Sequence, residues 1–135
     1  RPWERSSLKS GALKADEQSD GMKMLIVDDS AAMRRCIKKI LPASDEKLEC
    51  SDGRDAVRAF AKHQPDWVLM DIEMKDVDGL SAARQIKADW PKARIIFVTA
   101  HDKARYRDAA SQLKIDGYVL KDHLDEINQI VGGGE

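Results

Sequence analysis

The chain has 135 residues, of which 42% are hydrophobic and 35% charged, a composition typical of a single globular domain. Its 23 basic and 24 acidic residues give a formal net charge of −1, which argues against direct nucleic-acid binding by this chain. No apolar run is long enough to cross a bilayer, so the sequence also argues against a membrane protein.

The polarity of the chain changes near residue 22. Residues 1–21 are polar and Ser-rich, with no charged-then-apolar signal segment, and we interpret them as a flexible N-terminal extension. Residues 22–131 alternate short apolar runs with apolar residues at helical spacing, which predicts one domain of βα units. Residues 132–135 form the expected C-terminal tail.

Most of the predicted strands are short apolar runs, typical of strands buried on both faces of a parallel sheet, whereas residues 47–50 are a weaker strand signal. In chain order they are 24–27, 47–50, 67–70, 95–98 and 117–120. A helix is predicted after each strand, because apolar residues recur there at intervals of three and four. The predicted inward-facing residues are Met33, Cys36, Ile37 and Ile40; Ala56, Val57, Phe60 and Ala61; Ala82, Ala83, Ile86 and Trp90; Tyr106, Ala109, Ala110 and Leu113; and Leu124, Ile127, Ile130 and Val131.

Prolines and glycines predict where these helices end. Pro42, Pro65 and Pro91 follow the first three, and the glycine run from Gly132 is expected to stop the last. The cysteines, Cys36 and Cys50, have no metal-ligand spacing. We expect both to be buried, reduced thiols of a cytoplasmic protein.

Five βα units with right-handed crossovers predict an α/β fold with a doubly wound, five-stranded parallel sheet. The expected strand order is 2-1-3-4-5. In such a sheet every strand points the same way, and ligands bind outside the carboxyl ends.

Polar residues follow four of the predicted strands: Asp28 and Asp29, Asp71, Thr99, and Lys121. Each also has an ordinary structural explanation, since Asp caps helices, a strand-end lysine is usually solvated and threonine favours strands. Their joint occurrence at strand ends that share one edge favours a functional site.

Carboxylates that meet at one edge repel one another unless a cation lies between them. Mg²⁺, or Mn²⁺, suits a few carboxylates together with a phosphate oxygen. The carboxylate of Asp71 is then a candidate nucleophile toward phosphorus, with Lys121 and Thr99 available to stabilise the charged oxygens. The expected product is an aspartyl phosphate.

Five segments carry a family resemblance: residues 25–30, 68–71, 78–80, 98–100 and 117–121. In order and spacing they resemble the signature of the two-component response regulator receiver domain, of the chemotaxis type, over roughly Lys23 to Val131. The resemblance implies a flavodoxin-like receiver fold and a phosphoacceptor signalling switch with at most slow autophosphorylation and autodephosphorylation, not an enzyme. It implies a sensor histidine kinase or phosphotransfer protein as phosphoryl donor, with the output partner or output domain left open.

The resemblance also implies a role for each site residue. Asp71 is the expected phosphoacceptor, and Thr99 and Lys121 the residues contacting the phosphoryl group. Thr99 and Tyr118 are the expected switch pair, acting on the surface of the fourth helix, fifth strand and fifth helix. A phosphorylation-dependent homodimer is compatible with charges on that surface. The implied metal ligands are Asp28, Asp29, Asp71 and the backbone carbonyl of Glu73.

Some positions depart from the usual receiver pattern. Lys75 and Asp122 stand where many receivers have proline, and Glu73 adds a carboxylate two residues after Asp71. We expect Glu73 to affect the lifetime of the phosphoryl group, in a direction that the sequence leaves open. The histidines, including His101, have no ligand spacing and are expected at the surface or at helix ends.

Two other functions stay open. The chain can be an excised receiver of a DNA-binding transcriptional response regulator, because the Leu-Lys-Asp ending of the fifth strand resembles such proteins. It can also be a Mg²⁺-dependent aspartyl-phosphate phosphatase, although these enzymes usually carry Asp where this chain has Glu73.

Overall fold

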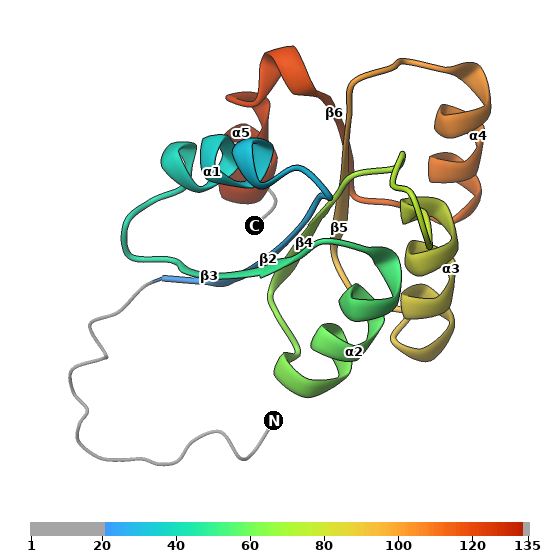
Figure 1. Ribbon diagram of the computed structural model, residues 1–135, viewed down its shortest axis with the longest axis horizontal. Helices are drawn as coiled ribbons and strands as arrows, with labels where there is room; N and C mark the ends of the chain where they lie inside the picture. The colour runs from blue at the N-terminus through green and yellow to red at the C-terminus, as the bar shows by residue number, and fades with distance from the viewer. Residues whose placement is uncertain (1–20, 134–135) are drawn as a thin grey trace.

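The computed structural model describes residues 21–133, so most of the predicted N-terminal extension and the last two residues of the predicted tail lie outside the described residues. Strands and helices alternate along the chain (Figure 1). Their bounds are β2 Lys23–Val27, α1 Ala31–Ile40, β3 Glu46–Cys50, α2 Gly53–His63, β4 Trp67–Met70, α3 Gly79–Asp89, β5 Ile95–Thr99, α4 Ala104–Gln112, β6 Gly117–Leu120, the 3-10 turn η3 Lys121–His123, and α5 Glu126–Gly133.

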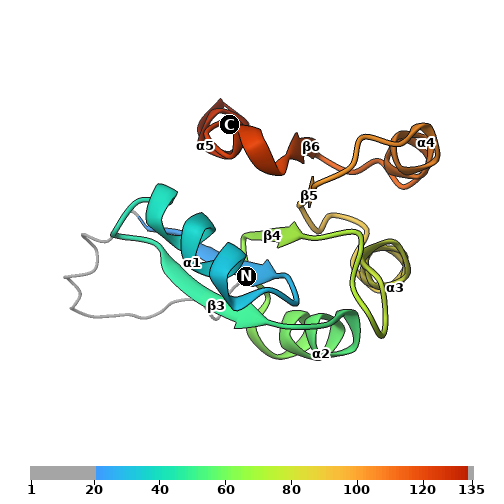
Figure 2. The ribbon, with the colours of Figure 1, turned by 45° about the horizontal axis from the view of Figure 1, so that its top comes forward.

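The strands form one parallel sheet in the order β3-β2-β4-β5-β6. Counted along the chain this is 2-1-3-4-5, so the predicted topology is confirmed. Helices α1 and α5 cover one face of the sheet, and α2, α3 and α4 cover the other (Figures 1 and 2). All five strands therefore deliver their carboxyl ends to a single edge.

The core consists of two clusters, one on each face of the sheet, because side chains alternate between faces along each strand. In β5, Ile95 and Phe97 belong to the cluster under α2, α3 and α4, whereas Ile96 and Val98 belong to the cluster under α1 and α5. All four are buried. Burial on both faces explains why β2, β4 and β5 appear in the sequence as apolar runs, whereas the outer strand β3 has no buried residue.

The sequence overestimated the width of two apolar helix faces. Cys36 and Ala61 were expected to be buried, but both are exposed. Cys36 lies next to the buried Ile37, and Ala61 next to the buried Phe60. One position turns the side chain by about 100° around the helix axis, away from the sheet. Cys50 is only partly buried, and burial, with the charges of Asp55 and Asp52, raises the pKa of its thiol to about 11.

The C-terminal helix starts after Leu124, which was expected to lie on its inner face, and ends later than expected. Residues 121–123 form the 3-10 turn η3, and α5 starts at Glu126 and continues through Gly132 to Gly133. Gly132 and Gly133, which were expected to stop the helix, are therefore part of it. Among the helices of the described residues, none is long and apolar enough to cross a membrane.

Three helices start with a side-chain cap. Ser30, Asp52 and Asp78 accept hydrogen bonds from the backbone N–H groups of Met33, Asp55 and Ser81. These caps satisfy amides that have no partner inside the helix.

We expect Asp52→Ala to lower the free energy of unfolding by about 1 kcal/mol, because it removes the acceptor 2.9 Å from the Asp55 amide. Urea unfolding followed by circular dichroism measures the change. Asp52→Asn is the matched variant, since asparagine also caps helices, and it should restore most of the loss. Equal losses in both variants would show that the cap is not the cause.

Candidate functional site

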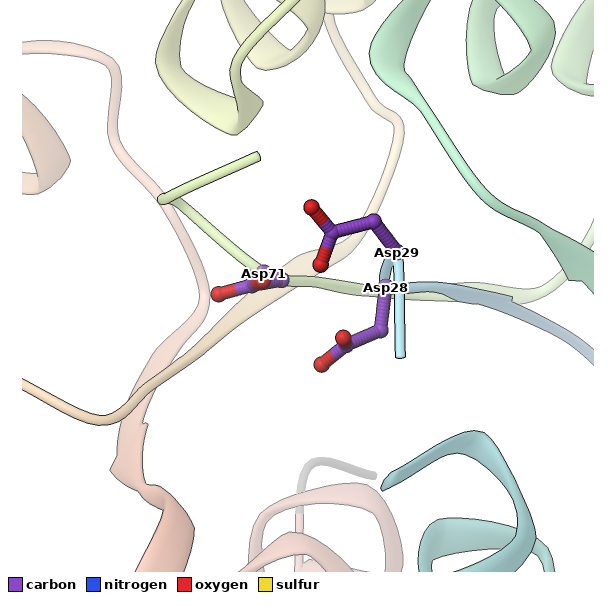
Figure 3. Close-up of side chains that lie close together, drawn as sticks. All are labelled: Asp28, Asp29 and Asp71. Atoms are coloured by element: carbon purple, nitrogen blue, oxygen red, sulfur yellow. The ribbon is translucent and has the colours of Figure 1, made fainter. Parts of the chain in front are cut away.

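The predicted site residues meet at the carboxyl edge of the sheet. Asp28 and Asp29 follow β2, Asp71 follows β4, Thr99 ends β5, and Lys121 follows β6. The close-up in Figure 3 shows the three aspartate side chains projecting into the same space from the ends of β2 and β4. Parallel pairing of β2 with β4 makes them neighbours, although more than forty residues separate them in the chain.

The three aspartates form a cluster that can hold a metal ion. Each offers a carboxylate oxygen, and these oxygens all lie within 4.8 Å of one another. Asp28 and Asp71 are buried, with exposed fractions of 1% and 3%, whereas Asp29 is exposed. A site with two buried carboxylates and one facing water suits a hard cation that keeps part of its hydration shell.

Lys121 bridges the two buried carboxylates. Its Nζ lies 2.9 Å from Asp28 Oδ2 and 3.5 Å from Asp71 Oδ2. Burial opposes the charge of the ammonium, but the contacts with both carboxylates outweigh burial and raise the pKa of Lys121. The lysine is therefore held as a cation beside the carboxylate of Asp71.

The negative charge of the Asp71 carboxylate is disfavoured by its surroundings. Burial, and next the neighbouring charge of Asp28, raises the pKa of its carboxyl to about 6, while Lys121 opposes the rise. Its backbone N–H donates to the Val27 carbonyl at 2.9 Å, and its Oδ1 accepts from the Glu73 amide at 3.3 Å. The carboxylate is thus fixed in position but short of positive charge, which a divalent cation would supply.

The backbone of Asp71 lies against Gly79, the first residue of α3. A Cβ atom on Gly79 would lie 2.0 Å from the carbonyl oxygen of Asp71 and 2.9 Å from Cα of Ile72. The Gly79 amide also donates to the Ile72 carbonyl at 2.9 Å. Only glycine allows this approach, so the Asp-Gly pair of the sequence holds the loop after Asp71 in place.

Thr99 and Tyr118, the predicted switch pair, lie on the neighbouring strands β5 and β6. Thr99 is fully buried, and its Oγ1 is 3.4 Å from the amide of His101. Tyr118 pairs with Phe97, two residues before Thr99. The guanidinium of Arg107 lies 4.2 Å from the centre of the Tyr118 ring. Burial raises the pKa of the Tyr118 hydroxyl, and no hydrogen bond of normal geometry reaches it from the described residues.

The side chain of Glu73 binds to residues that the sequence had not associated with it. Its Oε1 lies 2.6 Å from Nδ1 of His101, while its Oε2 lies 2.6 Å from the Tyr106 hydroxyl and 3.2 Å from Nζ of Lys103. Hydrogen bonds from Tyr106 and then His101 lower the pKa of Glu73 to about 2. No local signal predicts these pairs, because 28 to 33 residues separate the partners.

The comparison with protein families identifies one domain in the chain. The model of the response regulator receiver domain matches residues 24–132. This range contains every residue of the site described above and all of the strands except Lys23, the first residue of β2.

Curated relatives and solved structures are similar to this chain over most of its length. It is 31% identical to the transcriptional regulatory protein DegU of Brevibacillus brevis over 120 residues, which cover 84% of this chain and 51% of DegU. It is 42% identical to the chemotaxis protein CheY of Bacillus subtilis over 101 residues, 73% of this chain and 84% of CheY. A LuxR-family response regulator from Aurantimonas sp. SI85-9A1 superposes with a TM-score of 0.76 at 25% identity, covering 84% of each chain. The chain thus spans about half the length of DegU and most of CheY.

Proposed function

The chain belongs to the response regulator receiver domain family, and on that premise we propose that it is a phosphoacceptor switch of a two-component system. Asp71 receives the phosphoryl group from a sensor histidine kinase or a phosphotransfer protein. The observation that carries the proposal is the meeting of Asp28, Asp29 and Asp71 with Lys121 at one edge of the sheet.

The chemistry follows from the surroundings of Asp71. A carboxylate oxygen of Asp71 forms a bond to phosphorus while the bond from phosphorus to the donor's imidazole nitrogen breaks, and the imidazole regains a proton from water. Lys121, 3.5 Å from Asp71 Oδ2, stabilises the negative charge on the phosphoryl oxygens. The hydroxyl of Thr99 donates to another of these oxygens.

The acidic cluster fits Mg²⁺ or Mn²⁺. Its donors are hard carboxylate oxygens that lie within 4.8 Å of one another, an arrangement that a bound divalent cation would stabilise. The side chains of Asp28, Asp29 and Asp71, with the backbone carbonyl of Glu73, would hold the ion. When bound, the ion would neutralise charge on the carboxylates and on the incoming phosphoryl group.

The switch acts through Thr99 and Tyr118. The aspartyl phosphate carries about −1.5 to −2 charge, more than the carboxylate that it replaces, and its strong hydrogen-bond acceptors draw the Thr99 hydroxyl inward. The Tyr118 ring, which lies against the guanidinium of Arg107, moves toward the space that Thr99 leaves. The surface of α4, β6 and α5 changes as a result and recognises the output partner.

The test is the intact mass of the protein after incubation with acetyl phosphate, with and without Mg²⁺. We expect one added phosphoryl group per chain, only when Mg²⁺ is present. No added mass under either condition would contradict the proposal. Turnover of a small phosphate monoester would instead favour the phosphatase alternative.

We expect Lys121→Met to reduce the rate of phosphoryl incorporation by roughly tenfold, because one charged group beside the phosphoryl oxygens is lost. Mg²⁺ affinity should persist, since the carboxylates remain and a competing cation has gone. Mass spectrometry over time and calorimetric titration with Mg²⁺ measure the two effects. Lys62→Met, at an exposed position of α2, is the matched control and should leave both unchanged.

A second candidate is the receiver part of a DNA-binding transcriptional response regulator. It is favoured by the similarity to DegU, of which the chain spans 51%. The similarity to CheY, of which the match covers 84%, favours a receiver that acts alone. The mass of the natural full-length protein distinguishes the two.

The remaining assignments are proposals of the same kind. Residues 22–131 are the receiver unit, between an N-terminal extension (1–21) and a C-terminal tail (132–135), and limited proteolysis of the chain tests these bounds.

We place the protein in the cytoplasm, without direct nucleic-acid or membrane binding. Size-exclusion chromatography with and without beryllofluoride tests for the phosphorylation-dependent homodimer.

A further inference from the structure

The carboxylate of Glu73 connects the loop after Asp71 to the start of α4. We call Glu73, His101, Lys103 and Tyr106 the Glu73 latch. Glu73 lies two residues after Asp71, and its amide donates to Asp71 Oδ1 at 3.3 Å. Its three side-chain partners lie before and within the first turn of α4. One side chain therefore links the phosphoacceptor loop directly to the helix.

Tyr106 is the best-fixed member of the latch. Its exposed fraction is only 5%, its ring belongs to the core cluster under α2, α3 and α4, and its hydroxyl donates to Glu73 Oε2 at 2.6 Å. Hydrogen bonds to a charged group are among the strongest that a protein makes. The core fixes the Tyr106 ring, and its hydroxyl in turn fixes the carboxylate of Glu73.

The start of α4 has no side-chain cap, although Arg107 in its first turn pairs with Asp102 just before the helix, at 2.6 Å from Nε to Oδ1. The N-cap residue, Lys103, makes no side-chain hydrogen bond to the first turn, unlike the caps of α1, α2 and α3. A surface cavity of about 510 Å³ separates α4 from the loop after Asp71 and the start of α3, with Glu73, Leu80, Tyr106 and Ala109 among its lining residues. The helix therefore has space in which to move once the latch opens.

We propose that the Glu73 latch holds α4 in its unphosphorylated position and that a phosphoryl group on Asp71 opens it. The opening step rests on the proposed function, whereas the holding step does not. The aspartyl phosphate carries about −1.5 to −2 charge, more than the carboxylate that it replaces, and adds charged oxygens two residues from Glu73. The new charge repels the Glu73 carboxylate and attracts Lys103 and His101 away from it. Tyr106 then acts as a positioning residue that links the position of α4 to the chemical state of Asp71.

Hydrogen exchange of the backbone amides in α4 tests the holding step in the unmodified protein. Tyr106→Phe removes the hydroxyl but keeps the ring, and Glu73→Gln removes the charge at nearly constant size. We expect amide exchange near the start of α4 to be about tenfold faster in both variants, since each weakens a charge-assisted hydrogen bond. Ser111→Ala removes an exposed hydroxyl from the same helix and should leave the rates unchanged. Unchanged rates in both latch variants would overturn the proposal, and Glu73→Gln decides alone if Tyr106→Phe does not fold.

Beryllofluoride with Mg²⁺ tests the opening step. We expect it to accelerate exchange at the start of α4 in the native chain and to add little in Tyr106→Phe, whose latch is already open. An adduct at Asp71 without faster exchange in α4 would overturn the opening step. Absence of any adduct would instead contradict the proposed function, while the exchange rates of the unmodified variants would still decide whether the latch holds α4.

Discussion

Replacing Asp71 with asparagine is expected to abolish phosphoryl incorporation from acetyl phosphate. Asparagine has the shape of aspartate but lacks the anionic oxygen that attacks phosphorus. The side chain is 3% exposed, and its carbonyl oxygen can still accept from the Glu73 amide, so the fold should persist. Intact mass measures incorporation, and far-ultraviolet circular dichroism checks the fold.

The control for Asp71→Asn is the same substitution outside the acidic cluster. Asp108 lies on α4, is exposed, and has no ion-pair partner among the described residues. Asp108→Asn should incorporate phosphoryl groups at the rate of the native chain. Full incorporation in Asp71→Asn would refute the assignment of Asp71 and direct attention to Asp28 or Asp29 as acceptors.

Replacing Gly79 with alanine is expected to cost roughly 3 kcal/mol of unfolding free energy and to slow phosphoryl incorporation. The added methyl group would lie 2.0 Å from the carbonyl oxygen of Asp71, a distance that no contact between these atoms allows. The obstructing atoms belong to the backbone, so the loop itself has to shift, and the hydrogen bond from Gly79 to Ile72 is strained with it. Urea unfolding and the time course of intact mass measure both effects.

Gly132→Ala is the matched control, since a Cβ at that position of α5 would meet no atom within 4 Å among the described residues, apart from its own helix backbone and chain neighbours. Alanine has the higher helix propensity, so this variant should be unchanged or more stable by up to about 1 kcal/mol. A Gly79→Ala protein as stable as Gly132→Ala would show that the loop after Asp71 is not held in the close approach described above.

The two substitutions separate chemistry from position. Asp71→Asn removes the acceptor and leaves its surroundings, whereas Gly79→Ala leaves the acceptor and displaces its backbone. If both predictions hold, Gly79→Ala retains a slow incorporation that Asp71→Asn lacks. The reaction would then require Asp71, whereas the loop geometry would only set its rate.

The periodicity of the sequence was sufficient to predict the βα units and a parallel sheet. The strand order was an expectation for a doubly wound sheet, and the structure confirms it. Parallel strands end at the same edge of a sheet, so Asp28, Asp29, Asp71, Thr99 and Lys121 could be placed together from the sequence.

The limits of that prediction are clearest in the helices. The apolar spacing included Cys36 and Ala61, but both are exposed. Periodicity indicates the direction in which the apolar face of a helix points, but not how wide its contact with the sheet is. Packing against the sheet decided the width, and only Ile37 of α1 is buried.

The sequence by itself thus determined the fold, the acidic cluster and the lysine beside it. Only the tertiary structure decided that the Glu73 carboxylate binds Tyr106, Lys103 and His101, and that the backbone of Asp71 excludes a side chain at position 79. The physical reason is that these contacts join loops and helix ends far apart in the chain. Their formation depends on loop conformation and on the angle at which each helix leaves the sheet, and neither quantity is encoded in a repeating pattern of residues.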